Sequence, residues 1–407
     1  MKTESGKADL YKIFDSSETE LGYYRPRVIS FLLQYIDSHF FLFMTKVYPK
    51  WGGRLIGYYF SIFMIILSSF YLVKTLIPAQ NFAFRLLLAI PPLTWINTQG
   101  TILVSLRSAK LLCIAAIIYM FTLLIKSEKW SFDFLHYRAL FFHSILFTLF
   151  CLVDEQIISF LVLFTAYSIF MYFCDKKDLR SFVFYGGLSL IIYTLLFHTL
   201  LKTIFSHFTP NFKPTHLHTL SLLLKNFSWS FVLKSIQLYT IVVVKNFSFL
   251  LVFFLLAFIN ALRVKKYNDL LLVVVFISGS MISIAGISLI HPPITSFPDL
   301  KVSMYFLPVV TVFYCLLLYL LKDSNFTNKY QFLLAFTIVL VSLSNLSKFS
   351  EVYHALKTGH LAVFIPVSDV LTESITGQAN HDETIKALNT GVYSYLRIHR
   401  FLGKAST

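Results

Sequence analysis

Three short segments of the chain combine side-chain types that catalyse reactions or bind anions. The first, near the N-terminus, has three carboxylates followed by two arginines: Asp15, Glu18, Glu20, Arg25 and Arg27. A carboxylate serves as general base for an acceptor hydroxyl. The proline between the arginines stiffens the chain, so both guanidinium groups can be presented to one anion such as phosphate. The same composition also fits a solvated polar tail that leads into an interfacial anchor.

The second segment is Asp154-Glu155-Gln156, which separates two apolar runs. Two adjacent carboxylates in a tight turn suit a sugar hydroxyl, a cation or a basic side chain. The sequence identifies no certain cofactor, and the carboxylate pair makes a divalent cation a candidate. The alternative is a turn whose charges keep the loop in water.

The third segment places Lys301 and Tyr305 at the start of an apolar run, four residues apart and on one helical face. A lysine at a helix N-terminus is a workable phosphate ligand. An interfacial Lys and Tyr anchor explains the same pattern.

Other polar groups carry weaker signals. His136, His143 and His198 lie in or near apolar runs without metal-ligand spacing, so we expect satisfied core or interfacial histidines and no metal site. The four cysteines also lie in or at the ends of apolar runs and form no ligand pair. We predict that they are buried and inert.

The elements that must position these segments are predicted to be membrane helices. Hydrophobic residues make up 57% of the 407 residues and charged residues 14%, with a mean hydropathy of +0.70. Soluble domains carry about a quarter charged residues. The net charge of +15 comes from basic residues scattered over short loops. This pattern is typical of membrane orientation and excludes a nucleic-acid interface.

Ten apolar runs predict transmembrane helices, several of them shorter than the roughly 20 residues of a straight span. They are residues 55–76, 84–95, 103–125, 139–153, 157–174, 183–204, 249–262, 270–290, 304–321 and 332–346. Two amphipathic stretches, 28–47 and 228–244, are predicted to lie in the membrane interface. In the first, Ser30, Gln34, Asp37 and Ser38 share one face.

The basic loops alternate along this series only if 228–244 does not cross the membrane. All three candidate segments then lie on the outer side. The predicted fold is an all-α integral membrane protein with about ten transmembrane helices and two interfacial helices. We divide it into an outer polar segment (1–27), a transmembrane domain (28–346) and a small polar tail on the outer side (347–407).

The order of these features resembles the GT-C superfamily of polytopic membrane glycosyltransferases, which use polyprenyl-phosphate-linked sugars. The shared features are an outer acidic segment, the Tyr-Arg-Pro-Arg stretch, an acidic pair after four spans, and a late basic-x-x-x-Tyr-x-x-Pro entry to a span. The resemblance covers most of the chain as architecture, and its motifs are short.

The resemblance implies a catalytic carboxylate among Asp15, Glu18 and Glu20, with Glu18 and Glu20 favoured by their proximity to the arginines. It implies that Arg25, Arg27 and Lys301 hold the lipid phosphate. Asp154, Glu155 and Tyr305 would orient acceptor or donor. The implied reaction is direct displacement at the anomeric carbon with inversion, in which fixed cations stabilise the departing phosphate.

The implied partners are membrane lipid, a lipid-linked sugar donor and a glycan, lipid or protein acceptor. The implied location is the plasma (inner) membrane. The family begins with a transmembrane helix, whereas this chain begins inside the first outer loop. We therefore expect a truncated, split or mis-started chain, or one outside the family. A transporter or flippase of lipid-linked glycans, a polysaccharide polymerase and a non-catalytic membrane protein remain alternatives.

Overall fold

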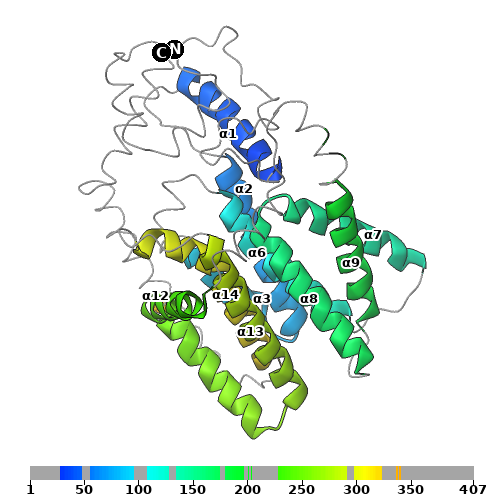
Figure 1. Ribbon diagram of the computed structural model, residues 1–407, viewed down its shortest axis with the longest axis vertical. Coiled ribbons are helices and arrows are strands. Elements are labelled where there is room, and N and C mark those ends of the chain that lie inside the picture. Colours follow the sequence, from blue (N-terminus) through cyan, green and yellow to red (C-terminus); the bar gives the residue numbers. More distant parts are fainter. Residues whose placement is uncertain are drawn as a thin grey trace.

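The described part of the protein is a bundle of helices (Figure 1). The computed structural model describes residues 28–47, 56–95, 108–127, 134–174, 179–196, 200, 203, 228–290, 298–322, 336–337 and 339–340. The helices are α1 (Val28–Val47), α2 (Ile56–Leu76), α3 (Phe82–Ala89), α4 (Pro91–Thr94), α6 (Ser108–Ser127), α7 (Phe134–Cys151), α8 (Glu155–Phe173), α9 (Arg180–Leu195), α12 (Trp229–Arg263), α13 (Tyr267–Ile290) and α14 (Pro298–Leu321). Within these ranges no residue forms a strand, so the predicted all-α class is confirmed.

Most predicted spans coincide with a helix, but one is interrupted. Residues 84–95 form two short helices, α3 and α4, that meet at Ile90. Pro91 and Pro92 follow directly, and neither has an N–H to continue the hydrogen-bond ladder of α3. The predicted run is therefore helical, but it divides at Ile90 into two short helices. The last predicted span, 332–346, lies largely outside the described residues.

Helix α12 joins the second amphipathic stretch to the span predicted after it. Phe247 has non-helical dihedrals (φ −129°, ψ 25°) and kinks the helix between the two predicted segments. In Figure 1 the part before the kink is seen almost end-on, whereas the part after it runs across the view toward α13. The two parts therefore take different directions.

The core of the bundle is built around α6. Nearly every residue of α6 from Leu111 to Leu124 is buried, and Phe121 packs edge-on against Phe164, Phe276 and Tyr319 from three other helices. Helix α8 is packed closely on two sides. A side-chain carbon added at Gly186 of α9 would meet Thr165, and one at Gly279 of α13 would meet Leu163. Small residues at such contacts allow apolar helices to approach one another closely.

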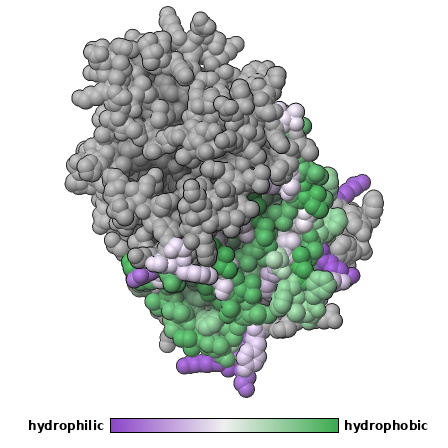
Figure 2. All heavy atoms as spheres, viewed as in Figure 1, coloured by the Kyte–Doolittle hydropathy of each residue, from purple (hydrophilic) through white to green (hydrophobic). Residues whose placement is uncertain are grey.

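The outside of the bundle is strongly apolar. Phe63 of α2, Phe142 of α7 and Ile282 of α13 are each more than half exposed. Figure 2 shows apolar side chains covering much of the lower part of the molecule, with hydrophilic ones gathered at its edges. In α1 the polar Ser30 is buried, whereas the apolar Phe43 is 59% exposed. The same helix also buries Phe31 and Leu33, so apolar side chains lie on both its inner and its outer sides.

Two described helices are long and apolar enough to cross a membrane, judged by length and composition. They contain the windows Tyr59–Leu76 and Gln156–Phe173. Seven shorter apolar helical segments, each of 10 to 17 residues, accompany them among the described residues.

Candidate functional site

The turn between α7 and α8 holds the first candidate group, Asp154. Its backbone is extended (φ −156°, ψ 141°), and its Oδ1 accepts a hydrogen bond of 3.0 Å from the backbone N–H of Gln156. This is an N-cap, which satisfies one of the N–H groups that every helix start leaves without an intrahelical partner. Asp154 is only 1% exposed. The charge of Asp154 therefore does not keep this loop in water, and the side chain of Glu155 is not described.

The first turn of α1 lies against this same turn. The backbone N–H of Ile29 donates to the carbonyl of Leu152 at 3.2 Å. Ser30 of α1 and Val153 are both buried beside this contact. The structure therefore brings the beginning of α1 to the Asp154 turn, although more than 120 residues separate them in the chain.

A second polar contact lies one to two helical turns farther along α8. The hydroxyls of Ser159 in α8 and Ser283 in α13 are 3.0 Å apart. Because Ser283 lies in the second half of α13, this contact places the C-terminal half of α13 beside the N-terminal half of α8. We call the end of the bundle formed by the α1 start, the α7–α8 turn and this half of α13 the Asp154 end.

The other predicted site residues are placed only partly. Asp15, Glu18, Glu20, Arg25 and Arg27 lie outside the described residues. Glu155 begins α8, and Lys301 and Tyr305 lie in α14, but their side chains are not described. The predicted meeting of carboxylates and arginines around one phosphate therefore stays a prediction.

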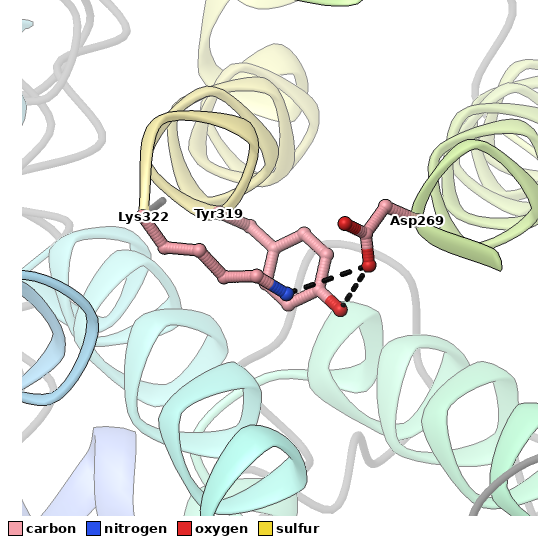
Figure 3. A network of polar contacts seen from close by, with 3 residues as sticks. All are labelled: Asp269, Tyr319 and Lys322. Carbon is pink, nitrogen blue, oxygen red and sulfur yellow. Dashed lines mark hydrogen bonds and ion pairs between the residues drawn. The ribbon is translucent and has the colours of Figure 1, made fainter. Parts of the chain in front are cut away.

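The opposite end of the bundle holds a cluster that the sequence analysis missed. Asp269 of α13 accepts hydrogen bonds at Oδ1 from the hydroxyl of Tyr319 (2.8 Å) and from Lys322 Nζ (3.4 Å). Lys322 Nζ also lies 3.6 Å from the centroid of the Tyr319 ring. Figure 3 shows the lysine laid along the ring, with both donors pointing at one carboxylate oxygen. These contacts link the start of α13 to the end of α14, and we call the three residues the clasp.

Basic residues gather at this second end. Two contacts show which helix ends lie together here. Lys126 Nζ of α6 donates a hydrogen bond to the hydroxyl of Tyr71 in α2. The hydroxyl of Tyr185 in α9 donates to the carbonyl of Leu123 in α6. Phe121 packs on Tyr319, next to Lys322. The residues placed there are Lys74, Lys126, Arg180, Arg263, Lys265, Lys266 and Lys322. We call this the basic end; the alternation of basic loops predicts such a grouping.

The interior histidine behaves as predicted. His143 Nδ1 is 3.0 Å from the hydroxyl of Tyr119, so it is a satisfied group inside the bundle. Among the described residues no three His, Cys, Asp or Glu side chains come together as a metal-ligand group. Cys113, Cys151 and Cys315 are buried, as expected, but Cys174, the C-cap residue of α8, is exposed. The prediction of a buried thiol is wrong for Cys174.

Comparison of the chain with known protein families, with curated proteins and with solved structures finds no match.

Proposed function

We propose that the chain is a multi-span membrane protein that transfers a sugar from a polyprenyl-phosphate donor at its Asp154 end. The membrane part of the proposal is supported by the apolar outer surface and by the collection of basic residues at the other end. Lipid tolerates exposed Phe, Leu and Ile, and positive charge is retained on the cytoplasmic side. The Asp154 end then faces outward.

The hydrogen bond between Ile29 and Leu152 carries the enzymatic part of the proposal. Arg27 is bonded to Val28, the first residue of α1, so the contact at Ile29 lies two residues along the chain from the arginine segment. The start of α1, which follows directly on the first candidate segment in the chain, therefore lies at the same end of the bundle as the second segment, and this supports their proposed convergence. Convergence is what a shared reaction centre requires, because catalytic groups act over a few ångströms.

Each residue has a distinct role in the proposed reaction. Glu20, Glu18 or Asp15 removes the proton from the acceptor hydroxyl, which attacks the anomeric carbon. Arg25, Arg27 and Lys301 stabilise the phosphate that departs. Glu155 and Tyr305 orient the substrates. Asp154 is a positioning residue, because one of its oxygens is engaged with the backbone of α8.

The proposal is tested with Glu20→Gln and Arg25→Ala. Membranes containing each variant receive polyprenyl-phosphate-linked radiolabelled sugar, and incorporation into lipid, glycan and protein is measured. We expect at least a hundredfold loss of transfer, because removal of a general base or of a charge-stabilising group costs about that much.

Matched controls are Glu4→Gln, a carboxylate in the same N-terminal region, and Lys74→Gln, an exposed cation at the basic end. Both controls should transfer sugar at the unaltered rate. Equal transfer by all four variants would remove these residues from the mechanism. An absence of transfer by the parent chain would favour a transporter or a non-catalytic protein.

A further inference from the structure

The turn between α12 and α13, residues 262–267, is the most densely charged described part of the basic end. It carries Arg263, Lys265 and Lys266 within four positions. Arg263 and Lys265 are exposed, and Lys266 is partly exposed. Three apolar side chains alternate with them and are also exposed: Leu262 (47%), Val264 (59%) and Tyr267 (66%). We call this segment the basic hairpin.

The backbone of the basic hairpin is a helix C-cap of the Schellman type. The N–H of Lys266 donates to the carbonyl of Ala261, and the N–H of Lys265 donates to that of Leu262, both at 3.1 Å. This motif requires a left-handed residue, which is usually glycine. Here Lys265 takes that position with φ 58°. A side chain is strained in this conformation, so folding alone favours glycine at this position.

Asp269, the acidic residue that follows the basic hairpin in the chain, already has cationic and hydroxyl partners. Asp269, in the first turn of α13, already accepts from Lys322 and Tyr319 of α14. Lys322 therefore offsets the negative charge of Asp269, so this carboxylate does not cancel the charges of the exposed Arg263 and Lys265.

We propose that the basic hairpin binds the headgroups of anionic phospholipids. This inference rests on the membrane location proposed above and is independent of sugar transfer. Arg263 and Lys265 contact the headgroup phosphate, while Leu262, Val264 and Tyr267 enter the boundary between headgroups and acyl chains. Alternation of cations with exposed apolar side chains suits a charged lipid surface better than a soluble anion. Lys265 retains its strained position because its charge serves this contact.

The test uses the full chain reconstituted in vesicles of equal parts phosphatidylcholine and phosphatidylglycerol. The protein is re-extracted in mild detergent, and the retained lipids are quantified by mass spectrometry. We expect retained phosphatidylglycerol to exceed its share in the vesicle. The variant that combines Arg263→Gln, Lys265→Gln and Lys266→Gln should lower the ratio of retained phosphatidylglycerol to phosphatidylcholine toward that of the vesicle. The expected decrease is about fivefold for each charge removed.

The matched control removes three other cations that end or begin helices, by Lys74→Gln, Arg138→Gln and Arg180→Gln. It should keep most of the enrichment. A second variant, Lys265→Gly, relieves the backbone strain, so it should unfold no earlier than the parent and yet retain about fivefold less phosphatidylglycerol. It keeps the test valid if the triple variant does not fold.

Three results would overturn the proposal: no enrichment in the parent chain, equal loss in both triple variants, or loss of the enrichment when inorganic phosphate is added. The last would identify a site for free phosphate. Sugar transfer by the basic-hairpin variants is measured in parallel and should be unchanged. Failure of lipid binding thus leaves the proposed reaction standing, and failure of sugar transfer leaves lipid binding standing.

Discussion

At the Asp154 end a buried aspartate accepts a hydrogen bond from its own helix, whereas at the basic end Asp269 accepts from two side chains of another helix. The first arrangement is local, since the donor is two residues away. The second depends on α13 and α14 lying side by side. A carboxylate therefore begins a helix at one end of the bundle and joins two helices at the other.

The ends also differ in what surrounds these carboxylates. Asp154 is enclosed by the start of α1 and the end of α7, and it is 1% exposed. Asp269 and Lys322 retain side-chain exposures of 16% and 24%. Water thus screens the pair at the basic end and not the cap at the Asp154 end.

The largest expected effect separates the start of α12, which the alternation of basic loops places on the outer side, from the basic hairpin on the other side of the membrane. In a background with Cys174→Ser, we introduce Ser228→Cys before α12 and Lys265→Cys in the basic hairpin; both positions are exposed. A membrane-impermeant maleimide should label the first only from outside sealed cells and the second only after the inner face is opened. A charged reagent cannot cross the bilayer, so the contrast is all or none.

The parent with Cys174→Ser alone is the control for this labelling. Its other three cysteines are buried and should not react. Labelling of both positions from the same side would show that the start of α12 and the basic hairpin do not face opposite compartments.

A smaller effect is expected at the clasp of the basic end. Asp269→Ala removes the acceptor of both Tyr319 and Lys322. It should lower the free energy of unfolding by about 1–2 kcal/mol, with the lysine contribution reduced by its exposure. Denaturant unfolding in mild detergent measures the change.

Asp269→Asn is the matched control for the clasp, because it keeps a carbonyl oxygen for Tyr319 and removes only the charge. It should lose less stability than Asp269→Ala. Equal loss in both variants would show that the charge pair, and not the tyrosine hydrogen bond, holds α13 to α14.

The smallest effect is expected at the Asp154 end. Asp154→Ala should destabilise the protein by about 1 kcal/mol through loss of one helix cap, whereas Asp154→Ser retains a capping oxygen. Hydrogen exchange should become faster at the Gln156 amide in Asp154→Ala alone. Slow exchange in both variants would mean that the α8 start does not depend on this cap.

The sequence predicted the helices better than their interruptions. The bounds of α1 agree with the predicted amphipathic stretch, because the spacing of Ser30 and its polar neighbours is a property of one segment. The kink at Phe247 also lies between two segments that differ in pattern. The sequence analysis did not predict the division at Ile90, although Pro91 and Pro92, which lack a backbone N–H, indicate it.

For the candidate site too, the sequence predicted the local feature and not the contact between distant residues. The prediction located Asp154 and Glu155 in a turn between helices, and an aspartate just before a helix start is a recognisable cap. The sequence contains no sign that Asp269 meets Tyr319, since 50 residues lie between them and many lysines and tyrosines are equivalent candidates.

By itself, the sequence determined the helical class, the positions of most helices and the alternation of basic loops, because periodicity, length and charge are local properties of the chain. Only the tertiary structure decided that the start of α1 meets the α7–α8 turn, that Asp154 is buried, and that Asp269 engages α14. These depend on which helices become neighbours, and that choice follows from packing of side chains and close approach at residues such as Gly186 and Gly279.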